Sequence, residues 1–245
     1  MRGLLAAVGF LTRIPVPARV FADSGVRARS LPWYPLVGLL IGAVVCGLDA
    51  WLPDSRPLLA AALVLLASVW LTGALHLDGL ADMADAWVGG MAGDADASRA
   101  RTLEIMKDPR SGPAAVTAVV LVLLLKFAAL ASLPAPAWAV LWVAPLLARM
   151  VVLAAFATTP YVRGGGIGSG LSDAPRVACA LSLLVGVALW GMAGVGGLMP
   201  VATVAVVFWL WRRACVMRLG GVTGDTAGAL IEMSEGAALV ALALA

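Results

Sequence analysis

The chain has 245 residues, of which 62% are hydrophobic and only 13% are charged, well below the quarter or so that is typical of soluble domains. Its net charge of +3 comes without a basic run interleaved with aromatic residues, so the composition gives no indication of nucleic-acid binding. We therefore predict an integral membrane protein: an all-α, polytopic bundle of transmembrane helices that forms a single domain over residues 1–245.

The first apolar stretch, Leu4 to Leu11, is too short to cross a bilayer. It is followed by the run TRIPVP rather than by a small-residue cleavage site, which predicts an interfacial or re-entrant helix that is retained in the protein. Six or seven spanning segments are then expected, at residues 31–52, 58–77, 114–133, 137–159, 177–199, 201–211 and 226–245.

Placing the amino terminus in the cytoplasm puts most of the 17 basic residues into inside segments, as the positive-inside rule requires. Half of the 14 acidic residues, from Asp78 to Asp108, then fall into one inside loop of about 30 residues. Loops of that length are usually functional when they are ordered. In the first span, Gly38 and Gly42 form a small-xxx-small pair that favours close helix packing, either within one subunit or between two.

Three carboxylates directly follow the second apolar segment: Asp78, Asp82 and Asp85. On a helix these positions fall within an arc of roughly 60°, so the three side chains would face one place. Charges beside the lipid need pairing, hydration or a cation, and oxygen ligands suit Mg²⁺ shared with a substrate phosphate. The cluster therefore predicts phosphate chemistry at a membrane surface. The alternative is that the acids only solvate a helix end.

A second charged group precedes the next apolar segment, where Lys107 and Arg110 flank Asp108. The two cations could bind phosphate oxygens beside a further ligand or base. Taken alone, these charges are more typical of a solvated loop.

Two later inside loops add polar groups beside glycines. Arg163 opens a glycine-rich run at 163–170, which could let backbone N–H groups approach an anion but could also be a flexible linker. Asp225 follows a turn with three glycines at 220–224, and could complete a metal site with the first cluster.

Charges inside the predicted spans are expected to face the bundle interior. For Arg149 the expected partner is a phosphate or a carboxylate of the acidic cluster, and Glu232 and Glu235 are expected to point inward. Lys126 is expected to extend outward to the interface, with no role. His76 could orient an aspartate or a substrate, or serve the structure alone.

A resemblance to a known family rests on five runs in order: LTRIPVP at 11–17, PLVG at 35–38, HLDGLAD at 76–82, IMKD at 105–108 with Arg110 and Gly112, and GG at 220–221 with Thr223, Gly224 and Asp225. Together they make the chain similar to the adenosylcobinamide-GDP ribazoletransferases, also called cobalamin (5'-phosphate) synthases, over nearly its whole length. Two positions depart from the family pattern, Ala86 and Pro109, where glycine and serine are usual. Neither change removes a charged group.

The resemblance implies a multi-pass enzyme of the bacterial inner membrane with its active site facing the cytoplasm. Such an enzyme joins α-ribazole or its 5'-phosphate to adenosylcobinamide-GDP, giving adenosylcobalamin or its 5'-phosphate and GMP, with Mg²⁺ as cofactor. Besides these small molecules, the expected partner is the lipid bilayer. No nucleic-acid partner is expected, and the formation of a homo-oligomer is left open.

The site residues expected on this basis fall into three groups. The metal ligands are Asp78, Asp82, Asp85 and Asp225. The catalytic residues, which clamp phosphate oxygens or accept the hydroxyl proton, are Asp85, Asp108, Lys107 and Arg110. The substrate-binding residues are His76, Arg149, Arg163, Gly221 and Thr223.

Two other functions fit parts of the pattern. A CDP-alcohol phosphotransferase would use similar carboxylates, but its longer motif, with Gly and then Ala-Arg after the second aspartate, is missing from the sequence. A cation-coupled transporter would explain the many spans and Arg149. Against it, the acids gather on one predicted face and no repeat relates the two halves of the sequence.

Overall fold

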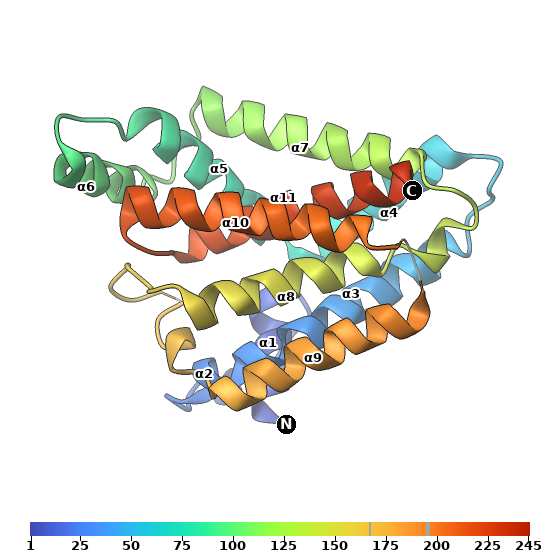
Figure 1. Cartoon of the computed structure of the whole chain (residues 1–245), viewed down its shortest axis with the longest axis horizontal. Helices are drawn as coiled ribbons and strands as arrows, with labels where there is room; N and C mark the ends of the chain where they lie inside the picture. Colours follow the sequence, from blue (N-terminus) through green and yellow to red (C-terminus); the bar gives the residue numbers. More distant parts are fainter. Residues whose placement is uncertain (167, 195–196) are drawn as a thin grey trace.

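The computed structural model describes residues 1–166, 168–194 and 197–245. Ile167 of the glycine-rich run, and residues 195 and 196 of the fifth predicted span, lie outside the described residues. The described part of the chain is all-helical, as predicted (Figure 1). Its α-helices are α1 (Arg2–Leu11), α2 (Val26–Ser30), α3 (Tyr34–Asp49), α4 (Pro57–Thr72), α5 (Leu75–Gly89), α6 (Ala95–Ile105), α7 (Pro113–Ala131), α8 (Val143–Thr158), α9 (Arg176–Ala193), α10 (Met199–Leu219) and α11 (Gly224–Leu244).

Among the described residues, six helical stretches are long and apolar enough to cross a membrane, or seven if the bent pair α4 and α5 counts as one span. This confirms the predicted number of spans and the multi-pass fold. The short apolar helix predicted at the amino terminus is α1, which packs against α2 and α3. In Figure 1 the long helices run side by side across the molecule, and α8 and α11 are the most enclosed of them.

The second predicted span, 58–77, is wrong at its carboxyl end, because the chain turns by 86° between α4 and α5. Gly73 and Ala74 occupy the turn with φ values of 63° and 57°, in the left-handed region that ends helices. Arg13 packs against this turn and donates its backbone N–H to the carbonyl of Leu71 at 2.7 Å. The acidic cluster therefore lies on a separate helix, α5, rather than at the end of a straight span. Together, α5 and α6 also fill most of the predicted 30-residue loop.

The short span predicted at 201–211 is also wrong, because α10 runs from Met199 to Leu219. The hydropathy pattern stops at Arg212, but the helix continues because this side chain finds partners within the bundle. Its guanidinium donates to the hydroxyl of Thr159 and to the carbonyl of Thr158, each at 3.0 Å. The arginine thereby binds the end of α8, whose last carbonyls lack helical partners.

Glycines set the closest helix contacts. A Cβ on Gly38 of α3 would lie 2.5 Å from the carbonyl oxygen of Pro145, and one on Gly42 would lie 2.8 Å from the Cα of Trp142. Both contacts are with the segment that forms α8 and the turn before it. Of the two interpretations of this pair, the structure supports packing within one subunit.

Four buried charges meet between α7, α8 and α11. The Nζ atom of Lys126 lies 2.7 Å from a carboxylate oxygen of Glu232 and 2.6 Å from one of Glu235, and Arg149 pairs with Glu235. The inward orientation of the two glutamates is confirmed. Lys126 is only 3% exposed, so the expectation that it extends outward is wrong. Its stem is held inside because both glutamates neutralise its charge there.

Candidate active site

Four aspartates gather where α5 crosses the start of α11. Asp78, Asp82 and Asp85 follow one another along α5, and Asp225 lies in the first turn of α11. Asp82 is partly buried, with the negative charges of the other three acting on it and the positive charge of Arg163 offsetting them. The structure therefore brings the predicted metal ligands into one neighbourhood, from two helices distant in the sequence.

Two glycines make this crossing possible. A Cβ on Gly79 would lie 2.7 Å from the carbonyl oxygen of Asp225 and 3.2 Å from the Cα of Gly228. A Cβ on Gly228 would in turn lie 3.3 Å from the carbonyl oxygen of His76. Because the helix backbones touch here, Asp78 and Asp225 are held at the edge of one pocket, which is described below.

Asp85 is directed toward α7 instead. One of its carboxylate oxygens accepts a hydrogen bond from the backbone N–H of Gly112 at 2.5 Å, and the other accepts one from Ala115 at 2.9 Å. An anion at this position satisfies free N–H groups of the first turn and interacts favourably with the helix dipole. The structure thus shows Asp85 capping α7, and its role as a metal ligand or base stays a prediction.

Arg163 reaches Asp225 across a short backbone pairing. The N–H of Val162 donates to the carbonyl of Val222 at 3.0 Å, and Val222 donates to Pro160 at 2.8 Å. The guanidinium of Arg163 then lies 2.5 Å from a carboxylate oxygen of Asp225. The cation predicted to bind an anion therefore stands at the acidic cluster.

Gly221 and Thr223, predicted as substrate contacts, are buried and have backbone roles. A Cβ on Gly221 would lie 2.2 Å from the carbonyl oxygen of Pro160, so glycine is needed for the pairing that positions Arg163. Thr223 caps α11 by accepting the N–H of Thr226 at 3.1 Å, while the hydroxyl of Thr226 accepts the N–H of Thr223 at 2.9 Å. Both residues shape the turn that presents Asp225.

Asp108, Lys107 and Arg110 lie on the loop before α7, which Asp85 fastens to α5 through Gly112. Asp108 and Arg110 pair with each other at 2.7 Å, and Lys107 is exposed. Hydrogen bonds from Arg110 lower the pKa of Asp108 to about 2. A carboxylate that holds its proton this weakly is a poor general base near neutral pH.

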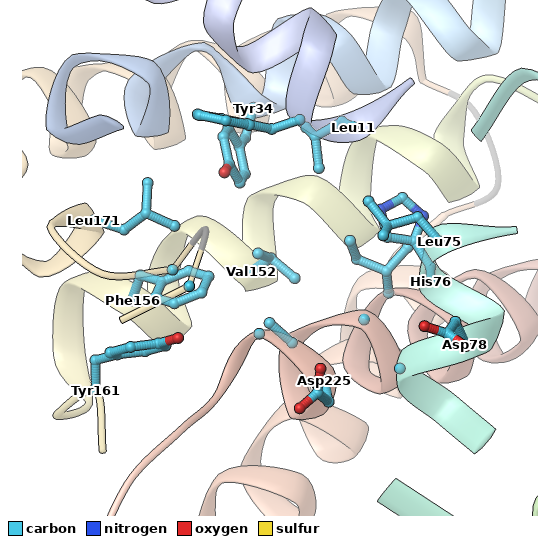
Figure 2. A pocket seen from close by; sticks show the side chains of 18 of the residues that line it. Leu11, Tyr34, Leu75, His76, Asp78, Val152, Phe156, Tyr161, Leu171 and Asp225 are labelled. Atoms are coloured by element: carbon cyan, nitrogen blue, oxygen red, sulfur yellow. The ribbon is translucent and has the colours of Figure 1, made fainter. Parts of the chain in front are cut away.

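A pocket of about 170 Å³ opens beside the acidic cluster. Figure 2 shows the carboxylates of Asp78 and Asp225 on one side of it and Tyr34 and Leu11 on the opposite side. His76 and Arg163 also line the pocket. It is the concave site of mixed chemistry that a small-molecule substrate requires.

The two predicted substrate residues of the spans differ in their placement. His76 is buried and lines the pocket, and neither of its ring nitrogens has a hydrogen-bond partner among the described residues. Arg149 is 0% exposed and does not line the pocket. Its carboxylate partner is Glu235, so the expected pairing with a carboxylate of the acidic cluster is wrong, while the pairing with a phosphate stays a prediction.

Sequence reasoning missed the apolar part of the pocket. Tyr34, Val152, Phe156 and Leu171 come from three separate regions of the chain. In the sequence they are ordinary residues of apolar segments, so no local signal distinguishes them from lipid-facing or core residues.

As they stand, no three His, Cys, Asp or Glu side chains of the described ranges form a group that could hold a metal ion. Asp78 and Asp225 share the pocket, and Asp82 is beside them. This donor set fits Mg²⁺, which usually takes one or two protein carboxylates and completes its shell with water and substrate phosphates.

Comparison with known proteins links these features to one family. The family described as cobalamin-5-phosphate synthase matches residues 3–243. The chain is 51% identical over 248 residues to an adenosylcobinamide-GDP ribazoletransferase of Pseudomonas paraeruginosa, covering 100% of this chain and 98% of the relative. Proteins of the same name from Stutzerimonas stutzeri and Ectopseudomonas mendocina are each 50% identical, over 100% and 97% of this chain and 98% and 97% of the relatives. No solved structure matches the chain.

Proposed function

The chain is an enzyme of the cobalamin-5-phosphate synthase family, and we propose that it joins α-ribazole or its 5'-phosphate to adenosylcobinamide-GDP. In this reaction a ribose hydroxyl attacks the phosphorus atom attached to the cobinamide, and the bond from that phosphorus to the oxygen of GMP breaks. The products are adenosylcobalamin, or its 5'-phosphate, and GMP. The proposal is carried by full-length similarity to proteins of this name together with a pocket that has aspartates from two helices at its edge.

Asp78, Asp82 and Asp225 would hold Mg²⁺ at this edge. Their charges repel one another when no cation is present, and the positive charge of Arg163 offsets this repulsion in part at Asp82. Mg²⁺ held by these residues would supply positive charge that stabilises the negative charge on the departing GMP. The carboxylates themselves fix where the pyrophosphate lies relative to the pocket.

Arg163 is the cation best placed to contact the pyrophosphate. It is paired with Asp225 across 2.5 Å, so an incoming phosphate and metal could each take one partner of this pair. Lys107 and Arg110 are exposed on the loop tied to α5, where they would contact the outer phosphate oxygens or the nucleotide.

We further propose that the enzyme lies in the bacterial inner membrane with the pocket open to the cytoplasm. Arg163, Gly166 and Gly168 of the glycine-rich loop line the pocket, and this loop lies at the same end of the bundle as α6 and the carboxyl end of α10 (Figure 1). These segments carry Arg99, Arg101, Arg163, Arg212 and Arg218. Such an excess of arginine is typical of a cytoplasmic face.

The deciding experiment uses the purified full chain in detergent with adenosylcobinamide-GDP and α-ribazole, with and without Mg²⁺. We expect one GMP released for each joined corrinoid, and no product after chelation of the metal. GMP release without a joined product would indicate a hydrolase, and the absence of turnover with Mg²⁺ would overturn the proposal.

A further inference from the structure

The pocket has two chemically different parts. One side is charged, with Asp78, Asp225 and Arg163, which the proposed function assigns to the pyrophosphate and metal. The remainder is mainly apolar and aromatic, with Leu11, Tyr34, Val152, Phe156 and Leu171 around it (Figure 2). A ligand that fills the pocket must therefore join an apolar, flat part to a polar part.

The side chain of His76, which lines this pocket, lacks hydrogen-bond partners within the described ranges. Its side chain is only 3% exposed, and both Nδ1 and Nε2 lack a hydrogen-bond partner among the described residues. A buried polar group without a partner is costly, and native structures leave few of them. His76 lines the pocket, and both ring nitrogens are themselves buried in the structure. A bound molecule can supply the missing bond once the imidazole turns toward the pocket.

We propose that the apolar part of this pocket binds the base of the nucleoside acceptor, a planar and largely apolar heteroaromatic ring, and that His76 donates a hydrogen bond to its free ring nitrogen. This inference rests on the proposed function, in which the acceptor is a ribazole, a nucleoside whose base is a benzimidazole. With the base beside Phe156 and Tyr34, the ribose extends toward Asp78 and Asp225. The attacking hydroxyl then meets the pyrophosphate at the charged side.

The other two rings of the reaction fit this part of the pocket less well. Guanine carries several donors and acceptors on its edges, and apolar walls would leave most of them unpaired. The corrinoid is much larger than the ligands that pockets of this size enclose. It must lie outside, with only its phosphate end reaching the aspartates.

The test measures KM for each substrate separately in purified protein. His76→Phe keeps a ring but removes both nitrogens, and should raise KM for α-ribazole about tenfold with KM for adenosylcobinamide-GDP unchanged. Phe156→Leu removes the aromatic wall and should act in the same direction, which decides the question if His76→Phe does not fold. Trp209→Leu, on an exposed part of α10, is the matched control and should leave both KM values unchanged.

Direct binding gives a second readout. Equilibrium dialysis without corrinoid and without Mg²⁺ should show that benzimidazole binds the unmodified chain, that α-ribazole displaces it, and that guanosine does not. Unchanged KM for α-ribazole in the folded variants, or displacement by guanosine alone, would overturn this inference while turnover by the unmodified chain upholds the proposed function. Absence of turnover by the unmodified chain counts against the proposed function itself.

Discussion

Gly79 of α5 and Gly228 of α11 face each other where the two helices cross. A Cβ added to Gly79 would lie 3.2 Å from the Cα of Gly228, and one added to Gly228 would lie 3.4 Å from the Cα of Gly79. Contacts this close are the usual reason for small residues between membrane helices. Asp78 precedes Gly79 in the chain, and Asp225 lies one helical turn before Gly228. The distance between the helices therefore also sets the geometry of the proposed metal site.

Gly79→Ala should therefore impair catalysis more than folding. The new methyl group meets the backbone of Asp225 and pushes α11 away, at a cost of about 1–3 kcal/mol in stability. A shift of about 1 Å at the carboxylates can lower kcat on the order of 100-fold. The measurement is kcat with both substrates, together with the unfolding temperature in detergent.

Gly47→Ala is the control for this substitution, because a Cβ there meets nothing within 4 Å. Alanine has the higher helix propensity, so the control should be as stable as the unmodified chain or slightly more so, with unchanged kcat. Full activity in Gly79→Ala would show that the crossing does not set the site geometry.

Asp82→Asn should abolish turnover while the protein still inserts and folds. The substitution removes one negative charge from the cluster, which lowers the affinity for Mg²⁺ rather than the stability. In the unmodified chain Mg²⁺ should raise the unfolding temperature, since a ligand that binds only the folded state stabilises it, and this rise should be lost in the variant. Asp96→Asn, an exposed acid on α6, serves as the control with normal activity. A normal Mg²⁺ response in Asp82→Asn would remove this residue from the metal site.

The fold class and most of the spans could be predicted because length and hydropathy constrain them strongly. The errors fall where a local feature outweighs hydropathy. At Gly73 and Ala74 two left-handed residues turn the chain inside an apolar run, and at Arg212 the partners that keep α10 helical lie on α8. Neither feature is visible in a hydropathy pattern.

The candidate site was predictable in its charges but not in their partners. Carboxylates beside the lipid need a cation or another partner. For that reason Asp78, Asp82 and Asp225 could be predicted to lie near one another. Arg149 pairs with Glu235 instead. This partner could not be predicted, because a pairing between α8 and α11 depends on tertiary packing that spacing along the chain does not reveal.

Asp85→Ala should lower stability by about 1 kcal/mol, the usual cost of losing a side-chain cap. The N–H groups of Gly112 and Ala115 would lose their acceptors. Asp85→Asn keeps one acceptor oxygen and should be less destabilised, with kcat within about tenfold of normal for a positioning role. Thermal unfolding and kcat of the two variants check this. Complete inactivity of a folded Asp85→Asn protein would support the predicted role of ligand or base instead.

Asp108 should remain ionised throughout the working pH range of the enzyme. Its pKa lies at about 2, below the ordinary value of 3.8, because Arg110 donates hydrogen bonds to its charged form. The ion pair between Asp108 and Arg110 is therefore intact above the ordinary pKa of Asp108 and is lost only as the pH falls toward 2. Asp108→Asn should therefore leave the apparent pKa values of the profile of kcat against pH in place, even if kcat itself falls. Loss of the acidic limb of that profile would identify Asp108 as the general base.

The buried charges between α7, α8 and α11 predict an order of stabilities. Within the described ranges, Glu235 forms ion pairs with both Lys126 and Arg149, whereas Glu232 pairs with Lys126 alone. Glu235→Gln leaves Arg149 without its anion and weakens Lys126, and breaking a buried pair in this way costs roughly 3–5 kcal/mol. Glu232→Gln should cost less, because Lys126 keeps Glu235. Unfolding temperatures in detergent should therefore fall furthest for Glu235→Gln.

The matched control is Glu104→Gln, which breaks the exposed pair with Arg101 at 3.0 Å. An exposed pair contributes about 0–1 kcal/mol, so this variant should unfold close to the unmodified chain. The same order should persist in high salt, because ions screen the exposed pair but do not reach the buried one. Equal destabilisation by Glu232→Gln and Glu235→Gln would mean that another group neutralises the charge of Arg149. The most direct source would be a ligand or water bound to Nε and Nη2 of Arg149, which have no hydrogen-bond partner in the described part of the chain.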